Sequence, residues 1–196
     1  MKEYVFLGDS ITDCDHIYDP DGLGDGYVHF IASEHTATNN HFLNLGYDGF
    51  TVSALKRLWK MKSASLNPTC ITILIGINDV AIIKNTGLDS NFALETFRIN
   101  YEMLIENILQ KFNCPIILME PFIFPYPAEY LTWAAEVHKM VDIIKEISEK
   151  YQLHFLSVSG ELKDRSLTTD GIHLTREGHI ILADLWMNFA KDIKII

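Results

Sequence analysis

The most marked shortage in this 196-residue sequence is of positive charge. Lysine and arginine number 16 against 26 aspartate and glutamate residues, which leaves a formal net charge of −10. Such a balance disfavours association with nucleic acid or with an anionic membrane surface, because both are themselves negatively charged. We therefore expect no nucleic acid and no membrane among the partners of this chain.

Cysteine is also scarce. Cys14, Cys70 and Cys114 are widely separated and odd in number, so they form neither a disulfide framework nor a metal-binding spacing. The eight histidines include no H-E-x-x-H pair, which disfavours a zinc hydrolase. The acidic segment 19–25 resembles a calcium loop only faintly, because Phe30 stands where the twelfth-position glutamate is needed. We expect no metal and no cofactor.

Long hydrophobic runs are missing too, and no segment approaches the length of a membrane span. The sequence enters its first strand-like run at Tyr4, which leaves no room for a signal peptide. Free cysteines fit a reducing compartment, so we expect a cytoplasmic protein. The length suits a single domain over residues 1–196, with no repeats or linkers. The sequence leaves open whether the chain forms homo-oligomers.

What the sequence does contain is an alternation of short apolar runs and amphipathic segments. Continuous β-branched runs that alternate with helices favour a parallel sheet covered on both faces. We therefore predict an α/β fold, a three-layer α/β/α sandwich around a five-stranded parallel sheet of flavodoxin-like type. The expected strands are Tyr4–Gly8, His41–Leu45, Cys70–Ile75, Pro115–Met119 and Leu153–Val158, and the expected helices are Tyr27–His35, Val52–Ser63, Asn91–Phe112, Tyr130–Tyr151 and Thr175–Ala190.

Two motifs near opposite ends of the chain carry candidate chemistry. Ser10 closes the segment Gly8-Asp9-Ser10 after the first strand, and Asp170 precedes His173 by three positions. A serine hydroxyl needs a neighbouring base, an imidazole suits that task, and a carboxylate orients the imidazole. Each motif also has a structural interpretation, in which Ser10 is an N-cap and Asp170 is a loop acid that caps a helix starting near Thr175.

Gly46 and Asn78 follow two further strand-like runs. Acyl transfer requires hydrogen-bond donors directed at the oxyanion of the tetrahedral intermediate. A glycine lets its N–H approach closely, and an asparagine side chain is a neutral donor, so both residues are candidate donors together with the Ser10 N–H. Both are equally at home as turn residues that end strands. Since parallel strands end at one sheet edge, the predicted fold gathers all three residues there.

These segments resemble the four sequence blocks of the SGNH, or GDSL-type, hydrolases, and the resemblance runs from residue 5 to residue 179. Matches at Ser10, Gly46, Asn78 and His173 supply all four letters of the name. The resemblance implies a serine esterase in which Ser10 is the nucleophile, His173 the base and Asp170 the acid. It also implies an oxyanion hole formed by Ser10, Gly46 and Asn78. The absence of G-x-S-x-G argues against the larger α/β-hydrolase class.

The substrate is expected to be a small-molecule ester. The first block, with the segment Leu23–Val28, resembles bacterial members that remove acetyl groups from sugars or short oligosaccharides. An acidic loop over Asp13–Tyr27 and the segment Pro121–Pro127 are candidates for a sugar-facing rim, although the phenylalanines of the second segment also suit a core. The alternatives are a lysophospholipase or thioesterase for longer acyl chains, and a non-catalytic binding module. His179 is expected at the surface or in helix packing.

Overall fold

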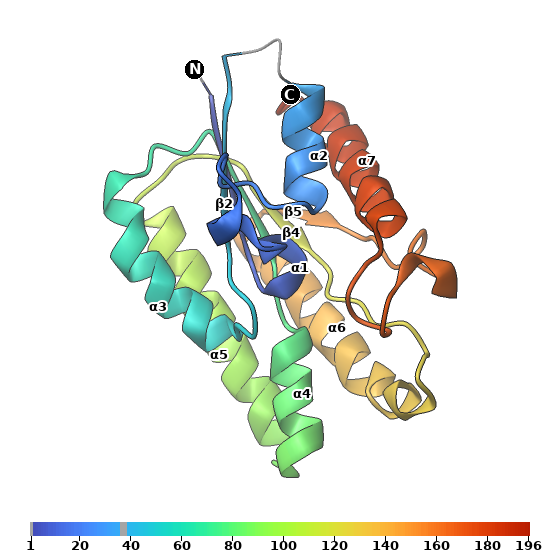
Figure 1. Ribbon diagram of the computed structural model, residues 1–196. Helices are drawn as coiled ribbons and strands as arrows, with labels where there is room; N and C mark the ends of the chain where they lie inside the picture. The colour runs from blue at the N-terminus through green and yellow to red at the C-terminus, as the bar shows by residue number, and fades with distance from the viewer. Residues whose placement is uncertain (1, 36–38) are drawn as a thin grey trace.

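The computed structural model describes residues 2–35 and 39–196, and its centre is a parallel sheet (Figure 1). The sheet order is β2-β1-β3-β4-β5, and every neighbouring pair is parallel. This is the flavodoxin-like doubly wound order, in which the chain reverses direction across the sheet between β1 and β3. The predicted α/β fold is confirmed. The strands are β1 Glu3–Gly8, β2 His41–Gly46, β3 Cys70–Leu74, β4 Ile116–Met119 and β5 His154–Leu156.

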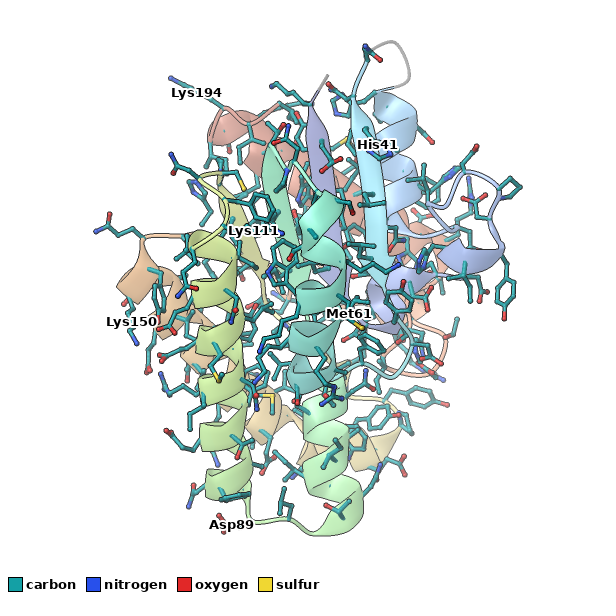
Figure 2. All side chains as sticks on the ribbon, turned by 90° about the vertical axis from the view of Figure 1, so that its left-hand side faces the viewer. His41, Met61, Asp89, Lys111, Lys150 and Lys194 are labelled. Atoms are coloured by element: carbon teal, nitrogen blue, oxygen red, sulfur yellow. The ribbon has the colours of Figure 1, made fainter. Side chains whose placement is uncertain are left out.

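Helices cover both faces of the sheet and complete the three layers. Figure 1 shows α2 and α7 together on one face, while α3, α5 and α6 lie on the other. Figure 2 views the second face, with Met61 on α3 and Lys111 just beyond α5. The helices are α1 Ser10–Asp13, α2 Tyr27–Glu34, α3 Val52–Lys62, α4 Ile77–Thr86, α5 Ser90–Leu109, α6 Ala134–Tyr151 and α7 Arg176–Asp192, and the short 3-10 turns are η1 His16–Tyr18, η2 Ser63–Ser65, η3 Ala128–Thr132 and η4 Arg165–Leu167.

The apolar strand sequences follow from burial on both sides of the sheet. Along β1, Val5 and Leu7 enter the core beneath α3, α5 and α6, whereas Tyr4 and Phe6 enter the core beneath α2 and α7. Successive side chains of a strand point to opposite faces, so a central strand needs apolar residues at every position. The two cores hold β1 rigidly and thereby fix the point at which Ser10 emerges.

The helices α1 and α4 were not among the predicted elements, and one predicted helix starts later than expected. The sequence predicts only a turn after β3, but Ile77–Thr86 forms α4, which ends at Gly87 in the left-handed conformation. The predicted helix over Tyr130–Tyr151 begins only at Ala134, after the turn η3. Short helices next to strands carry too few turns to display a clear 3.6-residue period. Among the described residues, no helix is both long and apolar enough to cross a bilayer.

Candidate active site

Ser10 lies where β1 passes into α1. The buried side chain of Asp9 caps this short helix by accepting a hydrogen bond from the Ile11 N–H at 3.1 Å. Because Asp9 takes the capping role, Ser10 is not the N-cap, and its hydroxyl remains available for another contact. Within the described part of the chain, no group accepts the Ser10 N–H.

The structure brings His173 and Asp170 to Ser10 across more than 160 positions of sequence. His173 Nε2 lies 3.0 Å from Ser10 Oγ, and His173 Nδ1 lies 2.6 Å from Asp170 Oδ2. A carboxylate accepts a hydrogen bond but cannot donate one, so Asp170 keeps the proton on Nδ1. Nε2 is then left as the acceptor for the Ser10 hydroxyl. The three side chains therefore form a connected serine–histidine–aspartate relay.

The charge state of Asp170 suits this arrangement. Partial burial pushes the pKa of Asp170 upward, but hydrogen bonds from the His173 side chain and from two backbone N–H groups outweigh it. Those N–H groups belong to Ile172 and His173, at 2.9 and 2.8 Å from Asp170 Oδ1. The net effect holds the pKa of Asp170 below its usual range, so the carboxylate stays ionised through the neutral region.

The loop that carries Asp170 and His173 is held in place by further hydrogen bonds. The Phe124 N–H donates to the Gly171 carbonyl at 2.9 Å, and the Thr168 hydroxyl donates to the His173 carbonyl at 2.8 Å. The cap of α7 is Thr175, whose hydroxyl accepts from the Gly178 N–H. The helix-capping interpretation of Asp170 is therefore wrong, because Asp170 turns toward His173 instead.

Gly46 lies at the end of β2 as predicted, but its N–H is already used. It donates to Asn44 Oδ1 at 2.9 Å inside the buried end of the strand. A Cβ at Gly46 would lie 2.3 Å from the Asp13 N atom, so this glycine is required for close packing of β2 against α1. The structure does not support Gly46 as an oxyanion donor. In the sequence, the feature that indicates this packing role is Asn44, two positions before Gly46, because its side chain folds back onto the glycine.

The loop after β2 offers a different donor. The Tyr47 N–H donates to the Gly8 carbonyl, the Asp48 N–H to Asp13 Oδ2, and the Phe50 N–H to the Tyr47 carbonyl. Among the described residues, none accepts the N–H of Gly49, which has a φ of +69° that glycine tolerates without strain.

Asn78 reaches this same loop from the first turn of α4. Its Nδ2 donates one hydrogen to the Phe50 carbonyl at 3.0 Å. An amide nitrogen carries two hydrogens, so one donor of Asn78 stays free while the other fixes the orientation of the side chain. The structure thus brings Ser10 and Asn78 to the switch point of the sheet, where doubly wound folds bind their ligands.

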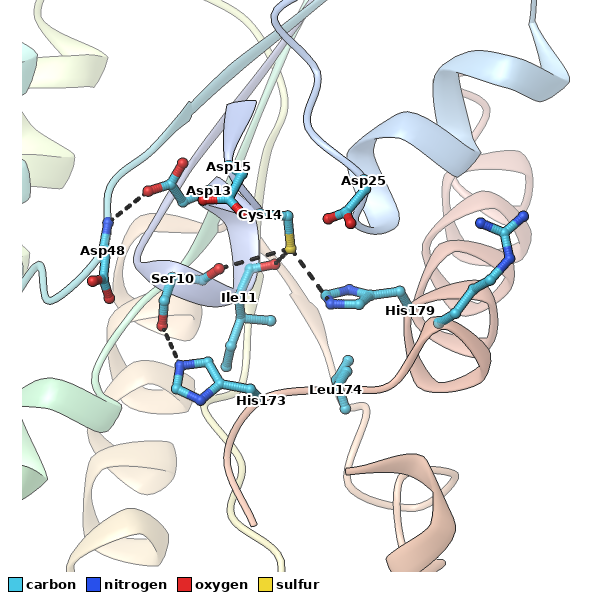
Figure 3. A pocket seen from close by; sticks show the side chains of 11 residues that line it. Ser10, Ile11, Asp13, Cys14, Asp15, Asp25, Asp48, His173, Leu174 and His179 are labelled. Carbon is cyan, nitrogen blue, oxygen red and sulfur yellow. Dashed lines mark hydrogen bonds between the residues drawn. The ribbon is translucent and has the colours of Figure 1, made fainter. Parts of the chain in front are cut away.

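A cavity of about 490 Å³ opens beside the serine–histidine pair (Figure 3). Ser10 and His173 form one wall, and Asp13, Asp15, Asp25 and Asp48 form much of the rim. His179 also lines the cavity, with Nε2 3.4 Å from Cys14 Sγ. Burial lowers the pKa of His179 to about 4, so it is neutral at neutral pH. The prediction of a helix-packing role for His179 is confirmed, and a surface position is wrong.

The two segments predicted as a rim behave differently. Phe122 and Phe124 are buried in the core beneath α7, so the core interpretation of the segment Pro121–Pro127 is correct for them. The loop after α1 does border the cavity, but through its aspartates and not through Tyr27, which is fully buried. Both phenylalanines follow β4 directly, and this position favours burial.

The fold and this relay define the class of protein as a serine hydrolase built on a flavodoxin-like α/β fold, with the relay at the carboxyl edge of the parallel sheet. The sequence model of the GDSL-like lipase/acylhydrolase family matches residues 6–181, and the chain belongs to that family. It is accordingly a serine carboxylic ester hydrolase.

Named relatives of this chain include esterases. The acetylxylan esterase of Geobacillus stearothermophilus is 28% identical over 93% of this chain and 90% of the relative. A structure of an acetyl-xylooligosaccharide esterase from Geobacillus shares a TM-score of 0.81 at 26% identity, over 95% of this chain and 93% of the other. A Parabacteroides merdae protein described as GDSL-like lipase gives a TM-score of 0.84 at 26% identity, over 95% and 94%.

Proposed function

We propose that this protein removes acetyl groups from acetylated sugars or oligosaccharides through an acyl-enzyme intermediate. The observation that carries the proposal is the serine–histidine–aspartate relay. Ser10 Oγ lies 3.0 Å from His173 Nε2, and His173 Nδ1 lies 2.6 Å from Asp170 Oδ2. Solved variants of the Geobacillus esterase support it, because they are described as catalytic mutants at a serine, an aspartate and a histidine. In that relative the aspartate also precedes the histidine by three positions.

In the proposed mechanism His173 takes the proton of Ser10 as the hydroxyl oxygen attacks the ester carbonyl carbon. Asp170 holds the imidazole in position and stabilises its positive charge. The protonated His173 then donates that proton to the departing sugar oxygen, which leaves an acetyl group on Ser10. A water molecule, deprotonated by the same imidazole, attacks the acetyl carbonyl and releases acetate and the free serine.

The proposed oxyanion donors are the Ser10 N–H, the free hydrogen on Asn78 Nδ2 and the Gly49 N–H. Gly49 takes the place that the sequence predicted for Gly46, because the Gly46 N–H is bonded to Asn44. The bond from Asn78 to the Phe50 carbonyl holds the Asn78 side chain beside Gly49. Donors held before the substrate arrives lower the barrier most, since they need no reorganisation during the reaction.

The assignment of the relay is tested by Ser10→Ala and His173→Ala, measured with nitrophenyl acetate. Each variant should lose at least about a thousandfold in kcat, because the nucleophile and its base act as one unit. Matched controls are Ser33→Ala and His41→Ala, at exposed positions of α2 and β2, with His41 visible in Figure 2. Both controls should retain wild-type kcat. A wild-type rate in either site variant would refute the mechanism.

The substrate class is tested separately with two series of esters. Nitrophenyl esters from acetate to decanoate report the acyl chain, and acetylated xylose oligomers report the alcohol. The proposal expects kcat/KM to fall as the acyl chain lengthens and acetate to be released from the sugars. A preference for long acyl chains would instead favour the alternative of a lysophospholipase or thioesterase.

A further inference from the structure

A second cavity, of about 350 Å³, continues from the first one away from Ser10. Cys14, Asp15, Asp25 and Arg176 line both cavities, which places the two side by side. The second cavity then extends toward the turn η1, where Tyr18 forms part of its wall. The two cavities together make a continuous depression that is longer than a single acetyl group requires.

Tyr18 is the most exposed large hydrophobic side chain of the described residues, with 80% of its surface accessible. At this exposure the Tyr18 ring packs little against the protein, and its place in the cavity lining leaves it accessible to a ligand. The flat face of a tyrosine packs on the C–H face of a sugar ring, and its hydroxyl reaches the ring substituents. Tyr18 therefore offers the second cavity a platform for a sugar.

The polar groups of this cavity have unused hydrogen-bonding capacity. Within the described part of the chain, no side chain or backbone donor binds the carboxylates of Asp15 and Asp25. The guanidinium of Arg176 lies over the Phe30 ring at 4.8 Å, with its N–H groups available at the cavity. Hydroxyl groups both donate and accept hydrogen bonds, so a sugar matches acceptors and donors placed together.

Other acidic residues of the same loop are occupied and serve as a contrast. Asp13 accepts from His16 Nδ1 at 2.7 Å and from the Asp48 N–H at 2.8 Å. Asp19 accepts from the N–H groups of Leu23 and Gly24. The loop thus uses these two carboxylates for its own structure. Asp15 and Asp25 remain free, and their negative charge disfavours an anionic ligand over a neutral one.

The loop that lines both cavities is held in place before any ligand arrives. The buried Asn44 side chain donates to the carbonyls of Thr12, Asp13 and Leu23, which ties β2 to α1 and to the loop. The Asp25 N–H donates to the Cys14 carbonyl at 3.0 Å. A loop fixed in this way loses little conformational entropy on binding, which favours affinity for even a small ligand.

We propose that the cavity at Tyr18 is a second sugar subsite, which binds the neutral sugar next to the acetylated one. This proposal rests on the proposed function only for the placement of the acetylated sugar beside Ser10. An oligosaccharide then occupies both cavities, with Tyr18 under the neighbouring ring and with Asp15, Asp25 and Arg176 around the glycosidic linkage.

The subsite is tested by direct binding, which needs no catalysis. Unacetylated xylose and xylotriose are titrated into wild type, Tyr18→Ala, Tyr18→Phe and the control Met61→Ala, and Kd is measured by NMR. Met61 is also exposed, on α3 and outside the cavity. For wild type, Met61→Ala and Tyr18→Phe, xylotriose should bind more tightly than xylose. Tyr18→Ala should weaken xylotriose binding about fivefold to tenfold, the loss expected for one aromatic contact.

Two outcomes would overturn the subsite: xylotriose that binds wild type no better than xylose, or a Tyr18→Ala variant with an unchanged Kd for xylotriose. The control Met61→Ala lies outside both cavities, so its kcat/KM for nitrophenyl acetate should remain within about twofold of wild type. Tyr18-dependent binding without release of acetate from acetylated xylose oligomers would refute the proposed function and leave the subsite intact.

Discussion

At the scale of single residues, Asp9, which directly precedes Ser10, is unusual in its burial and in its raised pKa. Asp9 is 1% exposed, and burial raises its pKa to about 7, although the Ile11 N–H and the nearby His173 oppose this shift. Burial raises the pKa of Asp79 to about 7 as well, and the nearby Asp9 adds to this upward shift. Two carboxyl groups beneath the site therefore hold protons well above the range of an ordinary aspartate.

The raised pKa of Asp9 predicts a pH-dependent stability. The folded state keeps this proton up to about pH 7, whereas the unfolded chain releases it near 3.8, the ordinary pKa of an aspartate side chain. The folded state therefore binds more protons between these limits, and the contribution of Asp9 to stability falls as pH rises through that window. Asp9→Asn keeps a capping side chain without the charge.

The free energy of unfolding of Asp9→Asn and of wild type is measured with urea from pH 4 to pH 8. Relative to wild type, the variant should gain stability progressively as pH rises to about 7, by a few kcal/mol. The matched control Asp21→Asn, at an exposed position, should show no such trend. A constant difference between Asp9→Asn and wild type at every pH would contradict the raised pKa.

Asn78 carries a second prediction at this scale. Asn78→Ala removes a proposed oxyanion donor, so the activation barrier should rise by about 2.7–4 kcal/mol, a loss of roughly a hundredfold to a thousandfold in kcat. Asn78→Asp retains the size and an acceptor oxygen but loses the donor, and should show a similar loss. Both are measured with nitrophenyl acetate, with thermal unfolding as a check on the bond to the Phe50 carbonyl. A change confined to KM would exclude the oxyanion role.

At the scale of elements, one asparagine joins three of them. Asn44 receives the Gly46 N–H and donates to carbonyls of α1 and of the following loop. Losing these bonds in Asn44→Ala leaves buried carbonyls unsatisfied, which should destabilise the fold by about 2–4 kcal/mol. The kcat should fall too, because α1 carries Ser10.

Urea unfolding and kcat for nitrophenyl acetate measure the two effects of Asn44→Ala. Asn91→Ala, at an exposed position of α5, is the matched control and should change neither quantity appreciably. If the free energy of unfolding of Asn44→Ala equalled that of wild type, the packing of Gly46 alone would hold β2 against α1.

Element boundaries were predictable where periodicity was long, and not elsewhere. The strands and the long helices lie within a few residues of the predicted ranges, because burial on both faces or on one helical face leaves a strong pattern. The four-residue α1 and the helix α4 leave no such pattern. The role of Gly46 was missed for a related reason, since a side chain two positions earlier competes for its N–H and no spacing rule records that bond.

At the scale of the whole molecule, the strand order decides where chemistry is located. β1 lies between β2 and β3, so residues that follow these three strands meet at one edge although they are far apart in sequence. The loop after β5 then returns His173 to the same edge. The net charge of −10 is concentrated there in part, because four aspartates line the cavity beside Ser10. Charge at the rim favours a neutral substrate over an anionic one.

The sequence by itself determined the fold class and which side chains are candidates for nucleophile, base and acid at the carboxyl edge of the sheet. These follow from hydrophobic periodicity and side-chain chemistry, which are local properties. Only the tertiary structure decided which backbone N–H groups are paired and which are unpaired among the described residues. It assigns the Gly46 N–H to Asn44, leaves the Gly49 N–H unpaired among the described residues, and opens a second cavity at Tyr18. Hydrogen-bond partners and cavities arise from contacts between distant segments, so no local pattern encodes them.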